Sequence, residues 1–268
     1  MIVLDHCSTD ETPAILADIQ RETGRLTVLR EDSPVWNEMG HRQRLLDAAR
    51  AEGATHIAII DADEVISGNY LDSVRDQAIQ APPGAYISIP MRNLYGGIGT
   101  YRVNDGTLQG GIWGNSITTV AFGNSPACEW VSDDGYQHHQ REPRNSRLGL
   151  RIYPTQMEGG VMHLQFANRR RLLAKHALYQ MDEVIRWPGR RPVYKTAQEY
   201  GMAPNWHGAT FADVPASWWE PYSDIMHHLR LDDEPWQIRE CIRLMEVHGP
   251  EKFAGLNLFG VVGEPAYA

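Results

Sequence analysis

Residues 57–64 read Ile-Ala-Ile-Ile-Asp-Ala-Asp-Glu, an apolar run that ends in acidic residues. The four apolar residues predict a strand covered on both faces, as is typical of central strands in α/β proteins. Asp61 and Asp63 follow at the strand end, where open α/β sheets bind their ligands. Carboxylates at this spacing can turn toward one ion, and hard oxygen ligands suit Mg²⁺ or Mn²⁺. An acidic turn after a buried strand is the alternative, and this stretch alone does not decide between the two.

Strands and helices alternate on both sides of this stretch. The residue patterns predict strands at 2–4, 26–29, 57–60 and 86–90, and helices at 13–23, 40–52 and 70–80. Such alternation predicts a parallel, right-handed α/β sheet. The apolar spacing then predicts a long helix over 168–186 and another near 236–248. We therefore expect an α/β domain over residues 1–167 and a helical, tryptophan-rich C-terminal extension over 168–268 that packs on it.

Composition bounds the class of protein. The chain has 268 residues and a net charge of −9, which disfavours a general nucleic-acid-binding surface. Cys7, Cys128 and Cys241 lie too far apart for a disulfide framework or a zinc site, and this fits a cytoplasmic protein. No apolar run approaches the roughly 20 residues of a membrane span, so none is predicted.

The loop after the first strand carries a second polar motif. Residues 4–12 read Leu-Asp-His-Cys-Ser-Thr-Asp-Glu-Thr and lead into a predicted helix. Asp5 can accept a hydrogen bond from a nucleotide base or a ribose hydroxyl, although ordinary turn chemistry explains the loop equally well. These residues resemble the first-loop motif D-D/N-G/C-S-T-D-x-T of family 2-like glycosyltransferases. Residues 41–46 resemble the family's helix before the metal strand, and residues 59–64 resemble its D-x-D segment.

The resemblance covers residues 2–90 and, more weakly, 125–185. It implies the Rossmann-like GT-A fold, a mostly parallel sheet flanked by helices, with residues 1–167 as the catalytic domain. It also implies a nucleotide-sugar donor, with UDP or GDP as the nucleotide, and a divalent cation, Mn²⁺ or Mg²⁺. The cation is needed because the leaving nucleoside diphosphate develops charge that must be neutralised.

The resemblance also implies roles for individual residues. Asp5 would contact the base, and Arg42 or Arg44 would approach the donor. Asp61 would lie by the ribose or the sugar, and Asp63 would bind the metal on the diphosphate. A solvated helix face is the alternative for the two arginines.

Later residues would complete the site. His163, in the strand predicted over 160–165, is implied as a further metal ligand, and a satisfied core histidine is the alternative. Asp134 is our preferred general base for the acceptor hydroxyl, followed by Asp133, and a solvent loop is the alternative for both. We interpret Lys175 as part of a solvated helix face, with diphosphate binding as the alternative.

The sequence thus predicts a metal-dependent glycosyltransferase that acts on an acceptor hydroxyl with inversion. A nucleotidyltransferase and a degenerate, non-catalytic carbohydrate-binding or scaffold protein are the alternatives. The strand that usually opens the family's chain is not seen before Asp5. We therefore expect the edge of the strand at 2–4 to be open to pairing, and a homo-oligomer would use it. The sugar and the acceptor stay open.

Overall fold

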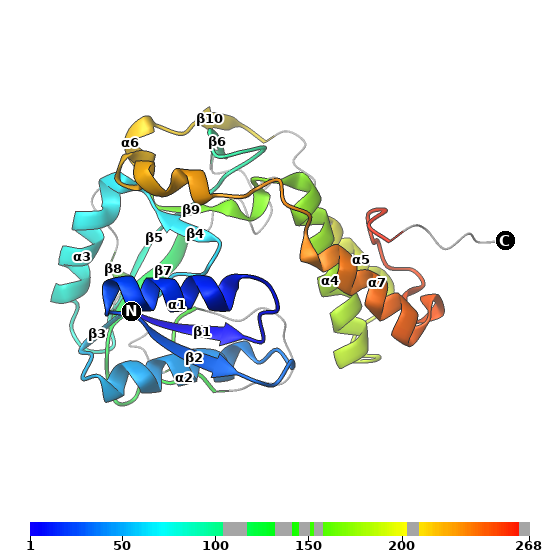
Figure 1. The fold of residues 1–268 in the computed structure, drawn as a ribbon, viewed down its shortest axis with the longest axis horizontal. Coiled ribbons are helices and arrows are strands. Elements are labelled where there is room, and N and C mark those ends of the chain that lie inside the picture. Colours follow the sequence, from blue (N-terminus) through cyan, green and yellow to red (C-terminus); the bar gives the residue numbers. More distant parts are fainter. Residues whose placement is uncertain (104–116, 132–140, 145–150, 153–157, 203–208, 263–268) are drawn as a thin grey trace. The chain divides into compact units, whose positions relative to one another are not determined.

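The structure is a computed structural model that describes residues 1–103, 117–131, 141–144, 151–152, 158–202 and 209–262 (Figure 1). The chain forms two compact units and passes between them several times. The first unit comprises Met1–Ile59, Arg75–Ser88 and Thr119–Tyr153, and the second comprises Ile60–Val74, Ile89–Thr118 and Pro154–Ala268. The boundary predicted between residues 167 and 168 lies inside the second unit, and the predicted domain division stays a prediction.

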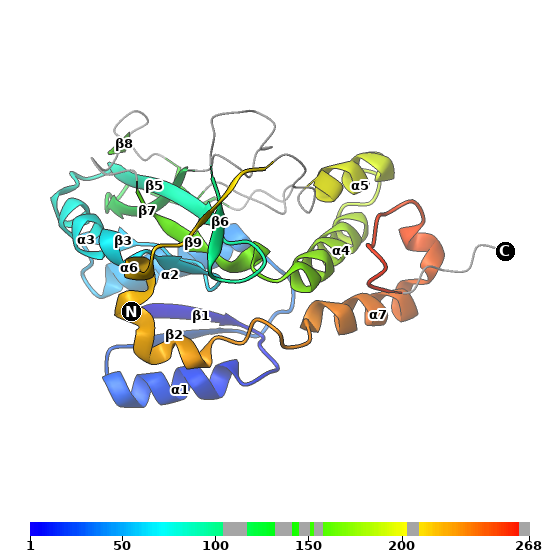
Figure 2. The same cartoon turned by 90° about the horizontal axis from the view of Figure 1, so that it is seen from above.

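The first unit begins with a β-α-β-α segment. Its elements are β1 (Ile2–His6), α1 (Thr12–Thr23), β2 (Thr27–Glu31) and α2 (Glu38–Ala51). β1 and β2 form a two-stranded parallel sheet, in which Ile2 lies opposite Thr27. Figures 1 and 2 both show this sheet between α1 and α2. α1 ends at Gly24, whose φ of 60° lies in the left-handed region that glycine adopts without strain.

The rest of the first unit packs around α2. β3 (His56–Ala58) pairs antiparallel with β7 (Ile117–Gly123). The start of β5 (Tyr86–Asn93) pairs parallel with β8 (Arg151–Ile152). The core here is formed by Met39, Leu46, Tyr86, Phe122, Cys128 and Trp130, with Ile57 and Ile59 packed against it. Arg50 of α2 donates to the carbonyls of Ser125 and Cys128, at 2.6 and 2.7 Å, and so fixes the segment after β7 on the helix.

The strand at 57–60 is less covered than its sequence predicts. Ile57 and Ile59 face the core, but Ala58 is exposed and Ile60 has 48% of its surface exposed. The prediction of a strand buried on both faces is therefore wrong, because packing covers the face of Ile57 and Ile59 and leaves alternate side chains at the surface.

The sheets are mixed, and a mostly parallel sheet is not confirmed. β1–β2, β5–β8 and β5–β9 pair parallel, whereas β3–β7, β4–β9 and β6–β10 pair antiparallel. Parallel neighbours need a crossover of about a dozen residues or more. The chain offers such crossovers up to β3, but only residues 59–63 separate β3 from β4 (Glu64–Ile66). The α/β class is confirmed by the alternation of helices and strands.

The second unit is built around β9 (Val161–His163). The end of β5 pairs parallel with β9, and β4 pairs antiparallel with it, so that Glu64 lies opposite His163. β6 (Thr100–Arg102) and β10 (Phe211–Asp213) form a separate antiparallel pair. Leu94, Met162, Ala167 and Trp218 form the core beside these strands.

Helices complete the second unit. They are α4 (Arg169–Arg186), α5 (Val193–Met202), α6 (Ala216–Trp219) and α7 (Trp236–His248), and α3 (Leu71–Gln80) runs from this unit into the first. The predicted helices at 168–186 and 236–248 are confirmed. α4 begins after Asn168, whose side chain accepts a hydrogen bond from the Arg171 N–H at 2.9 Å. α7 lies beside α4 in both ribbon views, and Met181 and Leu244 are buried in their contact (Figures 1 and 2).

The tryptophans of this region differ in their surroundings. Trp218 is buried in the core, whereas Trp236 at the start of α7 has 55% of its surface exposed. Within the described part of the chain, no helix combines the length and the apolar character that crossing a membrane requires.

Replacing Gly160 by alanine is expected to destabilise the second unit. Gly160 has a φ of 130°, and a Cβ there would lie 1.9 Å from the carbonyl oxygen of Pro90. The Gly160→Ala variant should lose more than about 1 kcal/mol of unfolding free energy, because strain and collision add. That loss corresponds to roughly 2–4 °C or more in a thermal melt. Gly99→Ala is the matched control, since no atom lies within 4 Å of its Cβ position. Equal melting temperatures for the two variants would contradict the close approach of β9 to β5.

A half-buried acid on α4, facing charged residues of α7, predicts a pH-dependent stability. Burial raises the pKa of Asp182 to about 6, and Glu240 adds to the rise while Arg186 and Arg243 oppose it. Because this folded-state pKa lies above the ordinary value of 3.8, the folded protein loses stability as pH rises through about 6.

Asp182→Asn should therefore stabilise the protein at pH 8 by roughly 2–3 kcal/mol, since each pKa unit corresponds to about 1.4 kcal/mol. The gain should shrink as pH falls from about 6 and vanish below 3.8, where the wild-type carboxyl becomes protonated in the unfolded state as well as in the folded one. Thermal melts from about pH 3 to pH 8 measure it, with the exposed Asp233→Asn as control. A gain that is constant with pH would contradict the prediction.

Candidate functional site

Asp63 and His163 lie side by side in the second unit. The register of β4 and β9 places Glu64 opposite His163, and Asp63 directly precedes Glu64. The Leu164 N–H donates to the Asp63 carbonyl at 2.8 Å and fixes the backbone at this point. The side chains follow, with 3.5 Å between Asp63 Oδ2 and His163 Nε2. The structure thus brings together the two residues that the sequence analysis assigned to a metal.

The imidazole of His163 is held by a buried amide. Asn93 Oδ1 lies 3.0 Å from His163 Nδ1, and Asn93 has only 3% of its surface exposed. An amide oxygen can only accept, so Nδ1 carries the hydrogen. In the neutral ring, Nε2 then turns its lone pair toward the Asp63 carboxylate. The Asp63 carboxylate and His163 Nε2 would then be two acceptors that face each other, and a cation bound to both would stabilise them. A hydrogen bond at the other ring nitrogen, like the one from His163 Nδ1 to Asn93, commonly orients a metal-binding histidine.

Lys175 makes a second side-chain contact at Asp63, and the predicted position of Lys175 on a solvated helix face is wrong. Its Nζ donates to Asp63 Oδ2 at 3.1 Å and to Gln165 Oε1 at 2.9 Å. Lys175 lies beside His176 on the inner side of α4, and 23% of its side chain is exposed. The long aliphatic part of the Lys175 side chain carries Nζ from α4 to Asp63. The helical spacing of residues does not predict where the end of such a side chain lies.

A chain of hydrogen bonds fixes the orientation of Gln165. The carbonyl of Tyr200 lies 3.2 Å from Nδ1 of the buried His176, which therefore donates to it. His176 Nε2 is then the acceptor for Gln165 Nε2, at 3.4 Å. The amide oxygen of Gln165 is left to face Lys175. None of these supporting residues was identified from the sequence as part of a site.

The charges at Asp63 and Lys175 stabilise each other. Burial would raise the pKa of Asp63, but the contact with His163 and the charge and hydrogen bond of Lys175 lower it well below its ordinary value. Burial would lower the pKa of Lys175, but the interactions with Tyr179 and Asp63 raise it. Asp63 is therefore an ionised carboxylate, and with 38% of its side chain exposed it remains accessible to a ligand.

Asp63 and His163 fit a divalent cation that takes its other ligands from a substrate. No group of three or more His, Cys, Asp or Glu side chains with metal-binding geometry occurs in the described part of the chain, so a cage made only of these side chains is not found there. Mg²⁺-type sites usually combine one or two carboxylates with phosphate oxygens and water. The ionised Asp63 and the lone pair of His163 match that kind of site.

Two further acids flank Asp63. Glu64 is buried, with 7% of its surface exposed, and its Oε2 accepts the Asp61 N–H at 3.1 Å. The carboxylate of Glu64 therefore holds the turn before β4, whereas Asp61 is exposed. The local structure separates these acids, because Glu64 is buried whereas Asp61 is exposed and Asp63 has 38% of its side chain exposed.

The donor-binding residues predicted upstream lie in the first unit. Asp5 is buried at 3% exposure, its Oδ1 accepts the Ser8 N–H at 3.2 Å, and its Oδ2 pairs with Arg30. Arg42 forms an ion pair with Glu38, one turn earlier on α2, at 2.6 Å. Asp5 thus organises the first loop.

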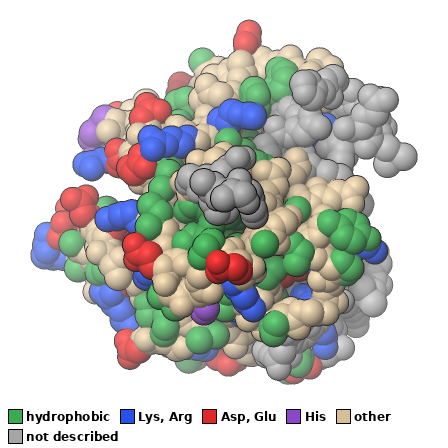
Figure 3. Space-filling model, turned by 90° about the vertical axis from the view of Figure 1, so that its right-hand side faces the viewer, with side chains coloured by type: hydrophobic (Ala, Val, Ile, Leu, Met, Phe, Trp, Pro, Cys, Tyr) green, Lys and Arg blue, Asp and Glu red, His purple; other side chains and the backbone are tan. Residues whose placement is uncertain are grey.

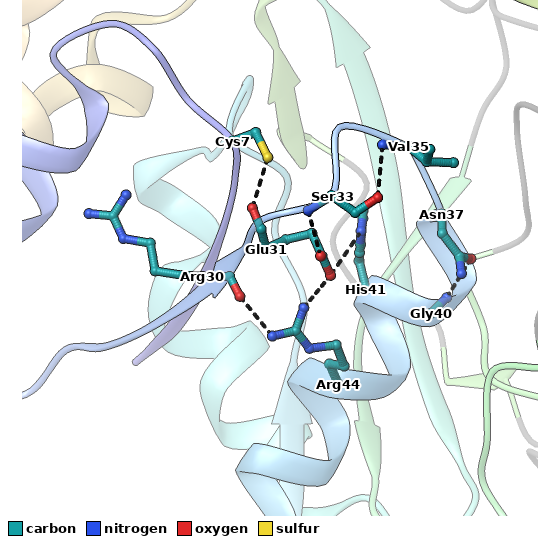
Figure 4. Close-up of polar contacts among 9 residues, drawn as sticks. All are labelled: Cys7, Arg30, Glu31, Ser33, Val35, Asn37, Gly40, His41 and Arg44. Carbon is teal, nitrogen blue, oxygen red and sulfur yellow. Dashed lines mark hydrogen bonds and ion pairs between the residues drawn. The ribbon is translucent and has the colours of Figure 1, made fainter.

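Arg44 links α2 to β2. It pairs with the Glu31 carboxylate and donates to the Arg30 carbonyl at 2.8 Å (Figure 4). The carboxylate of Glu31 also accepts the Ser33 N–H at 3.0 Å, and this bond is the main reason that the pKa of Glu31 is lowered. Glu31 thus holds α2 against the loop that follows β2.

Three rings lie beside this ion pair and were not predicted as a cluster. The ring centroids of His6 and His41 are 4.7 Å apart, and Trp36 lies 5.4 and 5.2 Å from them. Burial, followed by the neighbouring His6, lowers the pKa of His41. The three rings thus pack against one another beside the first loop.

The candidate general bases Asp133 and Asp134 lie outside the described residues. The segment before them is anchored, because the Trp130 N–H donates to Gln43 Oε1 on α2 at 2.8 Å and the Trp130 ring is buried.

Comparison with known proteins places the chain in a family. The family model for glycosyl transferase family 2 matches residues 1–136, half of the chain. No curated protein and no solved structure matches it. The match includes the first loop, α2 and the Asp61–Asp63 segment, whereas His163 and Lys175 come after it. The match over half of the chain shows that this chain belongs to glycosyl transferase family 2.

Proposed function

We propose that the protein transfers a sugar from a nucleotide-sugar donor, a UDP- or GDP-sugar, to a hydroxyl group of an acceptor, with inversion at the anomeric carbon. The observation that carries the proposal is the pairing of Asp63 Oδ2 with His163 Nε2 at 3.5 Å, in a chain whose family transfers glycosyl groups. A carboxylate and an imidazole nitrogen aimed at one point suit a cation on a diphosphate.

Asp63 and His163 would hold Mn²⁺ or Mg²⁺, since family members commonly use divalent metals. The bound cation would supply charge neutralisation for the departing nucleoside diphosphate. The protein's own contribution is to keep Asp63 ionised and to aim His163 Nε2 through Asn93. Asp61, exposed at the same turn, would contact the ribose or the sugar.

The transfer step is a single displacement. The acceptor hydroxyl oxygen attacks the anomeric carbon while the bond from that carbon to the phosphate oxygen breaks, and the nucleoside diphosphate leaves with the electron pair. The hydroxyl proton passes to a carboxylate, for which Asp134 is our first candidate and Asp133 the second. Attack on the face opposite the leaving group inverts the anomeric centre.

Asp5, Arg42 and Arg44 are proposed as donor contacts. The Asp5 side chain has no exposed surface, and it pairs with Arg30, whose side chain is 53% exposed. A nucleotide base would therefore reach Asp5 after Arg30 swings away. A carboxylate has about four lone-pair sites, so Asp5 can keep the Ser8 N–H while it accepts from a base.

Ligand-dependent melting separates this function from its alternatives. We expect UDP- or GDP-sugars to raise the melting temperature in the presence of Mn²⁺, and chelation by EDTA to remove the effect. Stabilisation by nucleoside triphosphates alone would instead indicate a nucleotidyltransferase. No response to any nucleotide would indicate a non-catalytic protein.

Removing the Asp63 carboxylate should abolish the cation-dependent part of this response. Asp63→Ala is expected to lower donor hydrolysis or transfer by at least about 100-fold, because the diphosphate loses its charge neutralisation. Asp76→Ala, at an exposed position on α3, is the matched control and should behave like the wild type. If Asp63→Ala retains both Mn²⁺ binding and donor turnover, the proposed site is wrong.

A further inference from the structure

We propose that Lys175 competes with the divalent cation for Asp63, so that the cation binds tightly only together with the nucleoside diphosphate. This inference rests on the proposed function and adds a residue beyond the part of the chain that the family match covers. Lys175 would act as a positioning residue that couples the binding of the cation to the binding of the donor.

The competition follows from one shared oxygen atom. Asp63 Oδ2 lies 3.1 Å from Lys175 Nζ and 3.5 Å from His163 Nε2. A divalent cation bound by Asp63 and His163 would therefore approach the oxygen that the ammonium already contacts. Two like charges at one carboxylate oxygen repel each other, and the repulsion is stronger at a partly buried pair than in bulk water. The cation binds only if the ammonium gives up this contact or finds a new anion.

Lys175 has little freedom to leave. It is mounted on α4, a helix of 18 residues, and 23% of its side chain is exposed. Gln165 Oε1 accepts from its Nζ at 2.9 Å, and Gln165 is held in turn by the buried His176. The Nζ also lies 5.8 Å from the centre of the Tyr179 ring. These neighbours keep the ammonium beside Asp63 even when its ion pair is disturbed.

Charge balance then links the cation to the donor. In the structure the negative charge of Asp63 and the positive charge of Lys175 cancel. A divalent cation added alone leaves this partly buried pair with two uncompensated positive charges, which is unfavourable. The diphosphate of a nucleotide sugar carries two negative charges and restores neutrality. Because coupling between two ligands is reciprocal, the cation also tightens donor binding.

The test measures Mn²⁺ binding without any sugar transfer. Free Mn²⁺ is followed by electron paramagnetic resonance or by calorimetry, in the wild type and in Lys175→Met, with Mn²⁺ alone and with Mn²⁺ plus UDP or GDP. Methionine retains an apolar stem and removes the charge. We expect Lys175→Met to bind Mn²⁺ alone at least about tenfold more tightly than the wild type, within the usual range of coupling between sites. The tightening of Mn²⁺ binding by the nucleotide should shrink by the same factor.

Two further variants distinguish a specific effect of Lys175 from a general loss of folding. Lys195→Met makes the same exchange at an exposed lysine of α5 and should leave Mn²⁺ binding unchanged. Lys175→Gln, a polar replacement, should reproduce the tighter binding if methionine disturbs the fold. A purely structural role of Lys175 would instead weaken Mn²⁺ binding when the residue is replaced.

The outcomes separate the two proposals. If Asp63→Ala abolishes Mn²⁺ binding but both Lys175 variants bind it as weakly as the wild type or more weakly, the competition is overturned and the proposed function stands. If Asp63→Ala binds Mn²⁺ as the wild type does, with and without nucleotide, both proposals are overturned. Tighter binding of Mn²⁺ alone in the Lys175 variants, together with weaker coupling to UDP or GDP, supports the competition.

Discussion

The register between β4 and β9 is the constraint on which the candidate site depends. It places Glu64 opposite His163, and thereby brings Asp63 beside an imidazole that lies 100 residues later in the chain. A shift of one residue would turn each side chain of the strand to the opposite face. The pairing is held on the other side of β9 by β5, where Gly160 lies too close to Pro90 for any larger residue. The packing of the β4, β5 and β9 backbones therefore determines how close Asp63 lies to His163.

Electrostatics then decide what this geometry can bind. Asn93 assigns a hydrogen of His163 to the ring nitrogen that faces away from Asp63, so in the neutral ring the near nitrogen is an acceptor. Lys175 supplies a positive charge from the opposite side. The same carboxylate thus faces an acceptor and a cation, which is a stable arrangement only because the ammonium neutralises it. On the face drawn in Figure 3, acidic and basic side chains are interspersed with hydrophobic ones.

Local signals predicted the parts of this structure that local chemistry controls. Gly24 ends α1 and Asn168 caps α4, so both helices follow from the sequence. The acidic segment and the first loop resembled the family because their residues are contiguous. The mixed sheets were not predicted, because β4 is a strand of three residues whose existence depends on β9. Lys175 was missed for a similar reason: its partners Asp63 and Gln165 come from other segments, and helical spacing does not show where a long side chain ends.

The position of Lys175 bears on both ends of the proposed reaction. A diphosphate that loses its sugar carries one more negative charge than it did in the donor, so a product-bound site needs more positive charge than a donor-bound one. The ammonium of Lys175, which Gln165 holds beside Asp63, would lie close to this additional charge on the product. A lysine at this place would therefore connect donor capture and product release through one carboxylate oxygen, whereas a solvated lysine would affect neither.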